Sequence, residues 1–209
     1  MDYKKIVLPK TYRYVTYGDV KTAQKVWIVL HGYGHLPNFF VRHFHCLCPK
    51  NNYVIVPEGI HRFYLNGTSG RVGASWMTKE SRSDDISDNL NFLNAIYQKE
   101  VESYHFSERI LLGFSQGGAT ASRWHENGNY HAHKFILWAS VFPPDLDFSS
   151  QKTPFQKSKN YFVIGDSDEY FNESTIKELK NHFNEKNLQF KWIHFNGKHQ
   201  LDPTILATF

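Results

Sequence analysis

Cysteine is scarce in this sequence of 209 residues. The two cysteines, Cys46 and Cys48, are separated by one residue, and a disulfide between residues so close would be strained. We therefore do not expect a fold held by disulfides. The hydrophobic fraction of 41% instead indicates a globular chain with a packed core. A chain of this length can bury one large core, so we expect a single domain over residues 1–209.

Long apolar runs and a strong excess of one charge are also missing. No run approaches the length of a membrane span, and the first residues lack the apolar stretch of a signal peptide. The formal net charge is only +4, and the basic residues are spread along the chain without a dense stripe. These absences argue against nucleic-acid binding and stable membrane insertion, and they favour a cytoplasmic protein. A homodimer stays open.

Short β-branched or aromatic runs alternate with amphipathic stretches along the chain. The runs predicted as strands are residues 26–30, 53–57, 109–112, 135–139, 160–164 and 190–195. Several of them are apolar almost throughout, which is typical of strands covered on both faces. The alternation predicts an α/β fold with a mostly parallel central sheet flanked by helices, and residues 11–17 as an antiparallel edge strand.

Helix ends and long connections complete this prediction. Pro37 suits the first turn of a helix, and Ser81 with Asp84 has the spacing of a capping box. Residues 59–80 and 140–159 form two long connections, which are often functional, but neither has the length of a separate cap domain. We therefore expect a site without a large lid.

The strongest chemical signal is the segment Gly113-Phe114-Ser115-Gln116-Gly117-Gly118. It follows a predicted strand and precedes a predicted helix at residues 119–125, as in the nucleophile elbow of the α/β-hydrolase fold. Such a serine lies on a sharp, strained turn, and glycines on either side let the strand and the helix approach each other. The segment predicts Ser115 as a nucleophile.

A serine hydroxyl needs an adjacent base, and in this fold the chain order is Ser, acid, His. His199 lies in a glycine-containing loop after the last predicted strand, whereas the alternative, His194, lies inside the strand pattern. Asp166 and Asp168 both follow the strand at 160–164. Asp168 is favoured as the acid because it is further past the strand end and can turn toward the histidine. Asp166 is expected to cap the turn.

The remaining site predictions concern the oxyanion hole and the substrate pocket. Two backbone N–H groups are needed, and we assign them to Gln116, after the nucleophile, and Tyr33, in the loop after the strand at 26–30. Aromatic and proline residues in the long connections are candidates for an acyl pocket, principally Trp76, Phe142 and Pro143. Arg71 and Arg82 are candidates for binding an acidic substrate group, with a solvated surface as the simpler interpretation.

Four segments in this order resemble the phospholipase/carboxylesterase family, which includes the acyl-protein thioesterases. They are Leu30-His31-Gly32-Tyr33-Gly34, Gly113-Phe114-Ser115-Gln116-Gly117-Gly118-Ala119, Gly165-Asp166-Ser167-Asp168 and Gly197-Lys198-His199. The resemblance implies a compact α/β hydrolase that has no large lid and needs no metal or other cofactor. It also implies Ser115 as nucleophile, His199 as base and Asp168 as acid, with the oxyanion amides on Tyr33 and Gln116.

The sequence departs from the family pattern at several places around the predicted pocket. His35 stands where many relatives have a small or acidic residue, and Glu169-Tyr170 replaces the usual proline and apolar residues after the acid. Residues 140–144, Ser-Val-Phe-Pro-Pro, replace a Ser-Gly step, and the final helix is expected to be short. These departures leave the catalytic atoms in place and bear on the choice of substrate.

We therefore expect a serine hydrolase that cleaves a small-molecule carboxylic ester or thioester through an acyl-enzyme. The alternative is a catalytically inactive hydrolase-like binding protein, which a missing triad member would favour, and none is missing. A zinc site formed by His43, His45, Cys46 and Cys48 is a weaker alternative. Their spacing on a predicted helix spreads the ligands over different faces, so we expect no metal.

Overall fold

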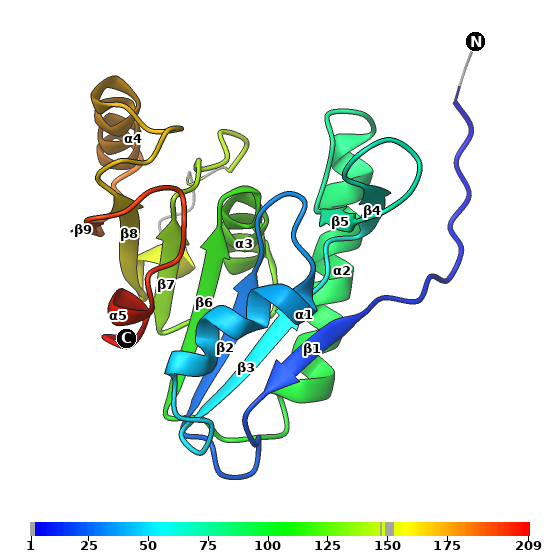
Figure 1. Cartoon of the computed structure of the whole chain (residues 1–209), viewed down its shortest axis with the longest axis horizontal. Helices are drawn as coiled ribbons and strands as arrows, with labels where there is room; N and C mark the ends of the chain where they lie inside the picture. Colours follow the sequence, from blue (N-terminus) through cyan, green and yellow to red (C-terminus); the bar gives the residue numbers. More distant parts are fainter. Residues whose placement is uncertain (1–2, 147, 149–152) are drawn as a thin grey trace.

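The computed structural model describes residues 3–146, 148 and 153–209. Its centre is a seven-stranded sheet in the order β1-β3-β2-β6-β7-β8-β9 (Figure 1). The strands are β1 (Tyr14–Tyr17), β2 (Lys25–Leu30), β3 (Asn52–Pro57), β6 (Glu108–Phe114), β7 (Lys134–Trp138), β8 (Lys159–Gly165) and β9 (Phe190–Phe195). Only β1, at one edge, runs antiparallel to its neighbour β3. The prediction of a mostly parallel sheet with helices around it is confirmed.

Helices cover both faces of this sheet. They are α1 (Pro37–Phe40), α2 (Arg82–Glu100), α3 (Gln116–Asn127), α4 (Glu173–Glu185) and α5 (Pro203–Leu206), with 3₁₀ turns at Val41–Cys46 and Pro154–Gln156. Buried side chains of α2, α3 and α4 belong to one hydrophobic cluster, and those of α1, the first 3₁₀ turn and α5 belong to another. None of the described helices combines the length and apolar character needed to cross a bilayer.

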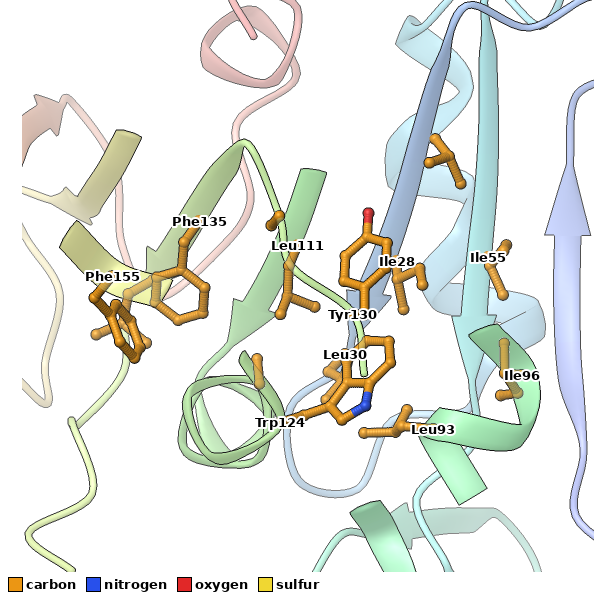
Figure 2. Close-up of a cluster of buried hydrophobic side chains, with 14 of the residues drawn as sticks. Ile28, Leu30, Ile55, Leu93, Ile96, Leu111, Trp124, Tyr130, Phe135 and Phe155 are labelled. Carbon is orange, nitrogen blue, oxygen red and sulfur yellow. The ribbon is translucent and has the colours of Figure 1, made fainter. Parts of the chain in front are cut away.

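The alternation of side chains along each strand divides the core into these two clusters. In β2, Ile28 and Leu30 face the cluster beneath α2 and α3, whereas Trp27 and Val29 face the other. Figure 2 shows the first cluster, in which Trp124 from α3 and Leu93 from α2 pack beside Leu30. Because its inner strands are buried on both faces, the sheet is a rigid platform for residues at its strand ends.

The first long connection contains a β-hairpin that the sequence did not predict. Strands β4 (His61–Tyr64) and β5 (Val72–Ser75) pair with each other outside the main sheet. A further bridge joins Ala74 to His35, in the loop after β2. The strands have four residues each and enclose a polar turn, so their alternation is too brief to stand out in the sequence.

The predicted capping box at the start of α2 is wrong. Ser81 does occupy the N-cap position, but its backbone is left-handed, with φ 47° and ψ 36°, and its side chain makes no capping hydrogen bond. A capping box needs extended backbone at that position. The carboxylate of Asp84 instead pairs with the Lys5 ammonium at 2.8 Å.

The helix predicted from Pro37 also differs in detail. Only residues Pro37–Phe40 are α-helical, and the chain continues as the 3₁₀ turn Val41–Cys46. Phe40 and Phe44 are buried in the second cluster. The last helix, α5, has four residues, in agreement with the expected short final helix.

Candidate active site

Ser115 lies at the turn between β6 and α3, and its backbone is strained. Its φ of 51° and ψ of −124° lie in a region that residues with a side chain rarely adopt. The neighbouring segment holds this turn. The Ser115 amide donates to the Trp138 carbonyl at 3.0 Å, and the Ser140 hydroxyl donates to the Ser115 carbonyl at 2.6 Å. The serine hydroxyl is thereby presented at the carboxyl end of the sheet.

Two glycines of the elbow are required by close packing. A Cβ atom at Gly113 would lie 2.4 Å from the Cα atom of Gly118, on the helix that follows. A Cβ atom at Gly117 would lie 2.4 Å from the Leu30 carbonyl oxygen, at the end of β2. Real Cβ contacts are not this short, so the strand and the helix can approach only because both residues lack side chains.

Asp168 and His199 form a close pair across the ends of β8 and β9. The Nδ1 atom of His199 lies 2.8 Å from Oδ2 of Asp168, and the two side chains are 16% and 0% exposed. The other carboxylate oxygen accepts the Tyr170 amide at 3.0 Å. An ionised carboxylate can only accept, so Nδ1 carries the proton and Nε2 keeps a free lone pair. The rings of Phe114 and Tyr170 lie against the imidazole, with centroids 5.0 and 4.7 Å away.

The alternative acid and base form a second, more exposed pair. His194 Nδ1 lies 3.3 Å from Asp166 Oδ1, and these side chains are 44% and 57% exposed. The prediction that Asp166 caps the turn is wrong, because its carboxylate points to His194 on the adjacent edge strand. Neither residue lines the cavity that contains Ser115.

Ser115 and His199 line one cavity of about 640 Å³. Gly32, Tyr33 and Gln116 also line it, and the buried Asp168 lies behind the imidazole. In the described part of the chain, no hydrogen bond joins the Ser115 hydroxyl to His199. Such hydrogen bonds often tighten only when substrate binds. The evidence that the two side chains can act together is therefore that they line the same cavity.

In the described structure the backbone amides of Tyr33 and Gln116 are free, and the segments that carry them are held by hydrogen bonds near β5. Within the described residues neither amide donates a hydrogen bond, so both are available to an incoming oxyanion. The adjacent Gly34 amide donates to the Ala74 carbonyl at 2.9 Å. The Gln116 side chain accepts from the Trp76 amide at 3.1 Å and donates to the Met77 carbonyl at 3.0 Å. The two segments that carry the amides are therefore both attached to β5 or to the residues directly after it.

His31 supports the loop that carries Tyr33, a role that the sequence analysis did not assign. Its Nε2 accepts the Gly59 amide at 2.9 Å, so its Nδ1 must donate to the Gly32 carbonyl at 2.8 Å. Burial lowers the pKa of His31 from 6.5 to about 4, which keeps the ring neutral at physiological pH. In the sequence, the only sign of this role was the His31-Gly32 step directly before Tyr33.

The prediction that Trp76, Phe142 and Pro143 line the substrate pocket is wrong. Trp76 is fully buried and donates from its indole N–H to the His31 carbonyl at 2.7 Å. Phe142 is buried against Phe155 and other core rings, and Pro143 is also buried. The segments that carry them turn these side chains into the core. The apolar wall of the cavity instead comes from Phe114, Val141, Tyr170 and Phe171.

A buried arginine fixes the segment after β7. Arg123 on α3 is 3% exposed and donates from Nε to Asp145 at 2.8 Å. This hydrogen bond lowers the pKa of Asp145. Arg82 also pairs with Asp145, at 3.2 Å, so its charge is directed to a structural carboxylate and away from the cavity.

The cysteine-histidine segment forms no evident metal site. Cys46 and Cys48 are both free and exposed. Among residues 3–146, 148 and 153–209, no three His, Cys, Asp or Glu side chains gather as a metal site would require.

The sheet order, the strained serine between strand and helix, and the histidine after the last strand define the α/β-hydrolase fold. The sequence pattern of the Phospholipase/Carboxylesterase family matches residues 12–208. The chain belongs to this family.

Solved structures with the same architecture include two carboxylesterases and a thioesterase. The Mesorhizobium loti carboxylesterase superposes with a TM-score of 0.72 at 13% identity, covering 94% of this chain and 93% of that one. The Bacillus cereus carboxylesterase gives 0.66 at 15% identity, with coverages of 94% and 91%. Acyl-protein thioesterase 2 of Zea mays gives 0.67 at 16% identity, with coverages of 94% and 95%. At these identities the likeness concerns the fold. No curated protein matches the sequence significantly.

Proposed function

We propose that this protein is a serine hydrolase that cleaves carboxylic esters or thioesters through an acyl-enzyme. One observation carries the proposal. The hydroxyl of Ser115, on its strained turn, opens into the same cavity as His199, whose Nδ1 is held by the buried Asp168. Membership of the phospholipase/carboxylesterase family supports this reaction class.

The first chemical step uses the free Nε2 of His199. The Ser115 oxygen attacks the acyl carbonyl carbon while His199 takes the hydroxyl proton, which forms a tetrahedral intermediate. Asp168 holds the imidazole in the required tautomer and stabilises the imidazolium that results. The intermediate collapses when the bond to the alcohol or thiol breaks and His199 returns the proton to that leaving group. Water then hydrolyses the acyl-enzyme by the same route.

The amides of Tyr33 and Gln116 stabilise the negative oxygen of the intermediate. Tyr33 precedes Gly34, which is bonded to β5, and the Gln116 side chain is bonded to the residues directly after β5, so both amides are positioned before substrate arrives. In serine hydrolases the loss of one such donor costs about 3–4 kcal/mol of transition-state stabilisation. The positive end of α3, which begins at Gln116, adds to the same effect.

Covalent labelling tests the nucleophile. A fluorophosphonate probe is expected to label the wild-type protein, and Ser115→Ala is expected to abolish both labelling and ester hydrolysis while the circular dichroism spectrum stays unchanged. Ser167→Ala is the matched control, because Ser167 is exposed and its side chain makes no hydrogen bond in the described structure. Labelling of the Ser115→Ala protein would refute the assignment. A wild-type protein that neither labels nor hydrolyses esters would indicate the inactive binding protein.

A series of esters and thioesters tests the substrate class. The apolar wall formed by Phe114, Val141 and Phe171 predicts that kcat/KM rises with acyl length until the cavity of about 640 Å³ is filled. Assays with 4-nitrophenyl esters and matched thioesters would measure this dependence on acyl length. Acyl chains of about two to twelve carbons suit a pocket of this size. A flat profile would contradict an acyl pocket at this wall.

A further inference from the structure

A second cavity of about 400 Å³ adjoins the catalytic one, and His35 lines both. Its walls come from the loop after β2, from α1 and from the start of β5. Leu36, Phe39, Phe40 and Val72 supply apolar surface. Because His35 lines both, the two cavities lie next to each other, within reach of one extended substrate molecule.

A continuous row of rings connects the two cavities. The imidazole of His199 contacts Phe114 at 5.0 Å between centroids, and Phe114 stacks on His35 at 5.9 Å with an interplanar angle of 6°. Beyond His35, Phe40 lies 5.7 Å away, and His43 lies 5.7 Å from Phe40. The catalytic imidazole and the far wall of the second cavity are thus linked by a series of neighbouring rings.

Arg71 gives the second cavity its charge. It is exposed at the edge of the hairpin turn, directly before β5, and lines the cavity. In the described part of the chain its guanidinium makes no ion pair, whereas Arg13, Arg62, Arg82 and Arg123 all pair with Glu58 or Asp145. None of the described residues that line this cavity is acidic. An arginine without a carboxylate partner beside an apolar wall is a suitable binding site for an anionic group on an organic molecule.

The two imidazoles in the lining add hydrogen-bonding capacity. Loss of solvent around the rings lowers the pKa of both His35 and His43, with His43 also lowering that of His35. Each ring carries at least one N–H donor in either protonation state. Arg71 then supplies the permanent positive charge of the cavity, and the imidazoles can donate to the same anion.

We propose that the second cavity is a subsite for a carboxylate or phosphate carried by the ester substrate, with Arg71 as its principal ligand and His35 and His43 as hydrogen-bond donors. The inference rests on the proposed esterase function. The substrate is thus a small ester with an apolar portion and one anionic group, and that group lies on either its acyl or its leaving-group side.

Two pairs of synthetic esters distinguish these sides. The first pair is the 4-nitrophenyl half-ester of glutaric acid and the 4-nitrophenyl ester of 5-oxohexanoic acid, in which a methyl ketone replaces the carboxylate. The second pair is a phenyl butyrate with a propanoate on its ring and the corresponding carboxamide. For each pair, the ratio of kcat/KM for the anionic ester to that for the neutral one measures recognition of the charge.

We expect the ratio for one pair to fall about tenfold in Arg71→Gln, to be partly retained in Arg71→Lys, and to fall with added salt in the wild type. Arg82→Gln is the matched control and should keep the wild-type ratio, because Arg82 is engaged with Asp145. An unchanged ratio for both pairs in Arg71→Gln, or an equal fall in Arg82→Gln, would overturn the subsite. Failure of the proposed function would look different, because the wild type would then neither label at Ser115 nor hydrolyse any ester.

Discussion

Two aspartate–histidine pairs join the ends of β8 and β9, and only one of them adjoins the cavity that contains Ser115. Asp168 and His199 are 2.8 Å apart and nearly buried, whereas Asp166 and His194 are 3.3 Å apart and about half exposed. The residue types and the chain order are the same. The difference lies in what surrounds each pair, because His199 faces the cavity of Ser115 and His194 faces solvent at the sheet edge. Proximity of a carboxylate to an imidazole is therefore not sufficient to define a catalytic pair.

Replacing each of the two histidines in turn should give the largest difference in kcat between the two pairs. His199→Gln removes the only imidazole proposed to deprotonate Ser115, and we expect kcat to fall by about 10⁴-fold or more. His194→Gln should change kcat by less than about twofold, because an exposed ion pair contributes little. Steady-state hydrolysis of a short 4-nitrophenyl ester measures both. Comparable losses in the two variants would show that the pairs are not functionally distinct.

The two aspartates should give a smaller contrast of the same kind. In Asp168→Asn the amide can donate a hydrogen bond to Nδ1, which favours the wrong imidazole tautomer, so kcat should fall by about 10³- to 10⁴-fold. Asp166→Asn should stay close to the wild type. The fluorophosphonate labelling rate is an independent measure, because it reports the reactivity of Ser115 without turnover. Equal labelling rates in the two variants would argue against Asp168 as the supporting acid.

Two other histidines, His31 and His125, are buried and are not paired with a carboxylate in the described structure. They extend the comparison from activity to the stability of the fold. Burial lowers the pKa of His31 to about 4 and that of His125 to about 3, from 6.5. Above pH 6.5 these rings are neutral in both the folded and the unfolded chain. As the pH falls below 6.5, only the unfolded chain takes up the protons, so stability is lost progressively down to the folded pKa values.

Each buried histidine should therefore cost about 2 kcal/mol of unfolding free energy between pH 6.5 and pH 5. Urea unfolding at both pH values measures the loss. His105→Gln is the control, because His105 is exposed and does not act on either buried ring, so its replacement should leave the pH difference unchanged. A free energy of unfolding that stays constant over this window would show that the two rings are not held neutral.

Among the described residues no aromatic ring packs against His194 as Tyr170 packs against His199, and the smallest expected effect concerns this tyrosine. Its ring packs edge-on against His199, with centroids 4.7 Å apart and an interplanar angle of 66°. Aromatic contacts of this kind contribute about 0.5–1.5 kcal/mol, so Tyr170→Ala should lower kcat/KM about twofold to tenfold. Tyr104→Ala, at an exposed tyrosine that does not line the cavity, is the control. An unaffected kcat/KM in Tyr170→Ala would mean that the ring does not orient the imidazole.

Much of the fold and the order of the site residues could be predicted because the signals are local. The elbow needs glycines at fixed distances from Ser115, and Asp168 and His199 each follow a short run rich in aromatic and β-branched residues. Strand ends of a parallel sheet meet at one edge, so local patterns sufficed to place these residues in one region.

The pocket lining could not be predicted in the same way. Trp76 and Phe142 were expected at the cavity because they lie in long connections, but both are buried in the core. Whether an aromatic residue of a connection points inward or outward depends on how that connection packs, and residue type does not reveal it. The β4–β5 hairpin was missed for a related reason, since its four-residue strands are specified mainly by their contacts with each other and with the loop after β2.

The attachment of both oxyanion segments to β5 has a geometric consequence. Ala74 binds the loop next to Tyr33, and the residues just after β5 bind the side chain of Gln116. The separation of the two amides therefore depends on the length of one short segment of extended backbone. A single inserted or deleted residue between Ala74 and Met77 would move one amide by about 3 Å relative to the other, because that is the rise of one residue in a strand. The hairpin thus helps to set the spacing of the two amides that we propose as the oxyanion hole, although it contributes none of the proposed catalytic groups.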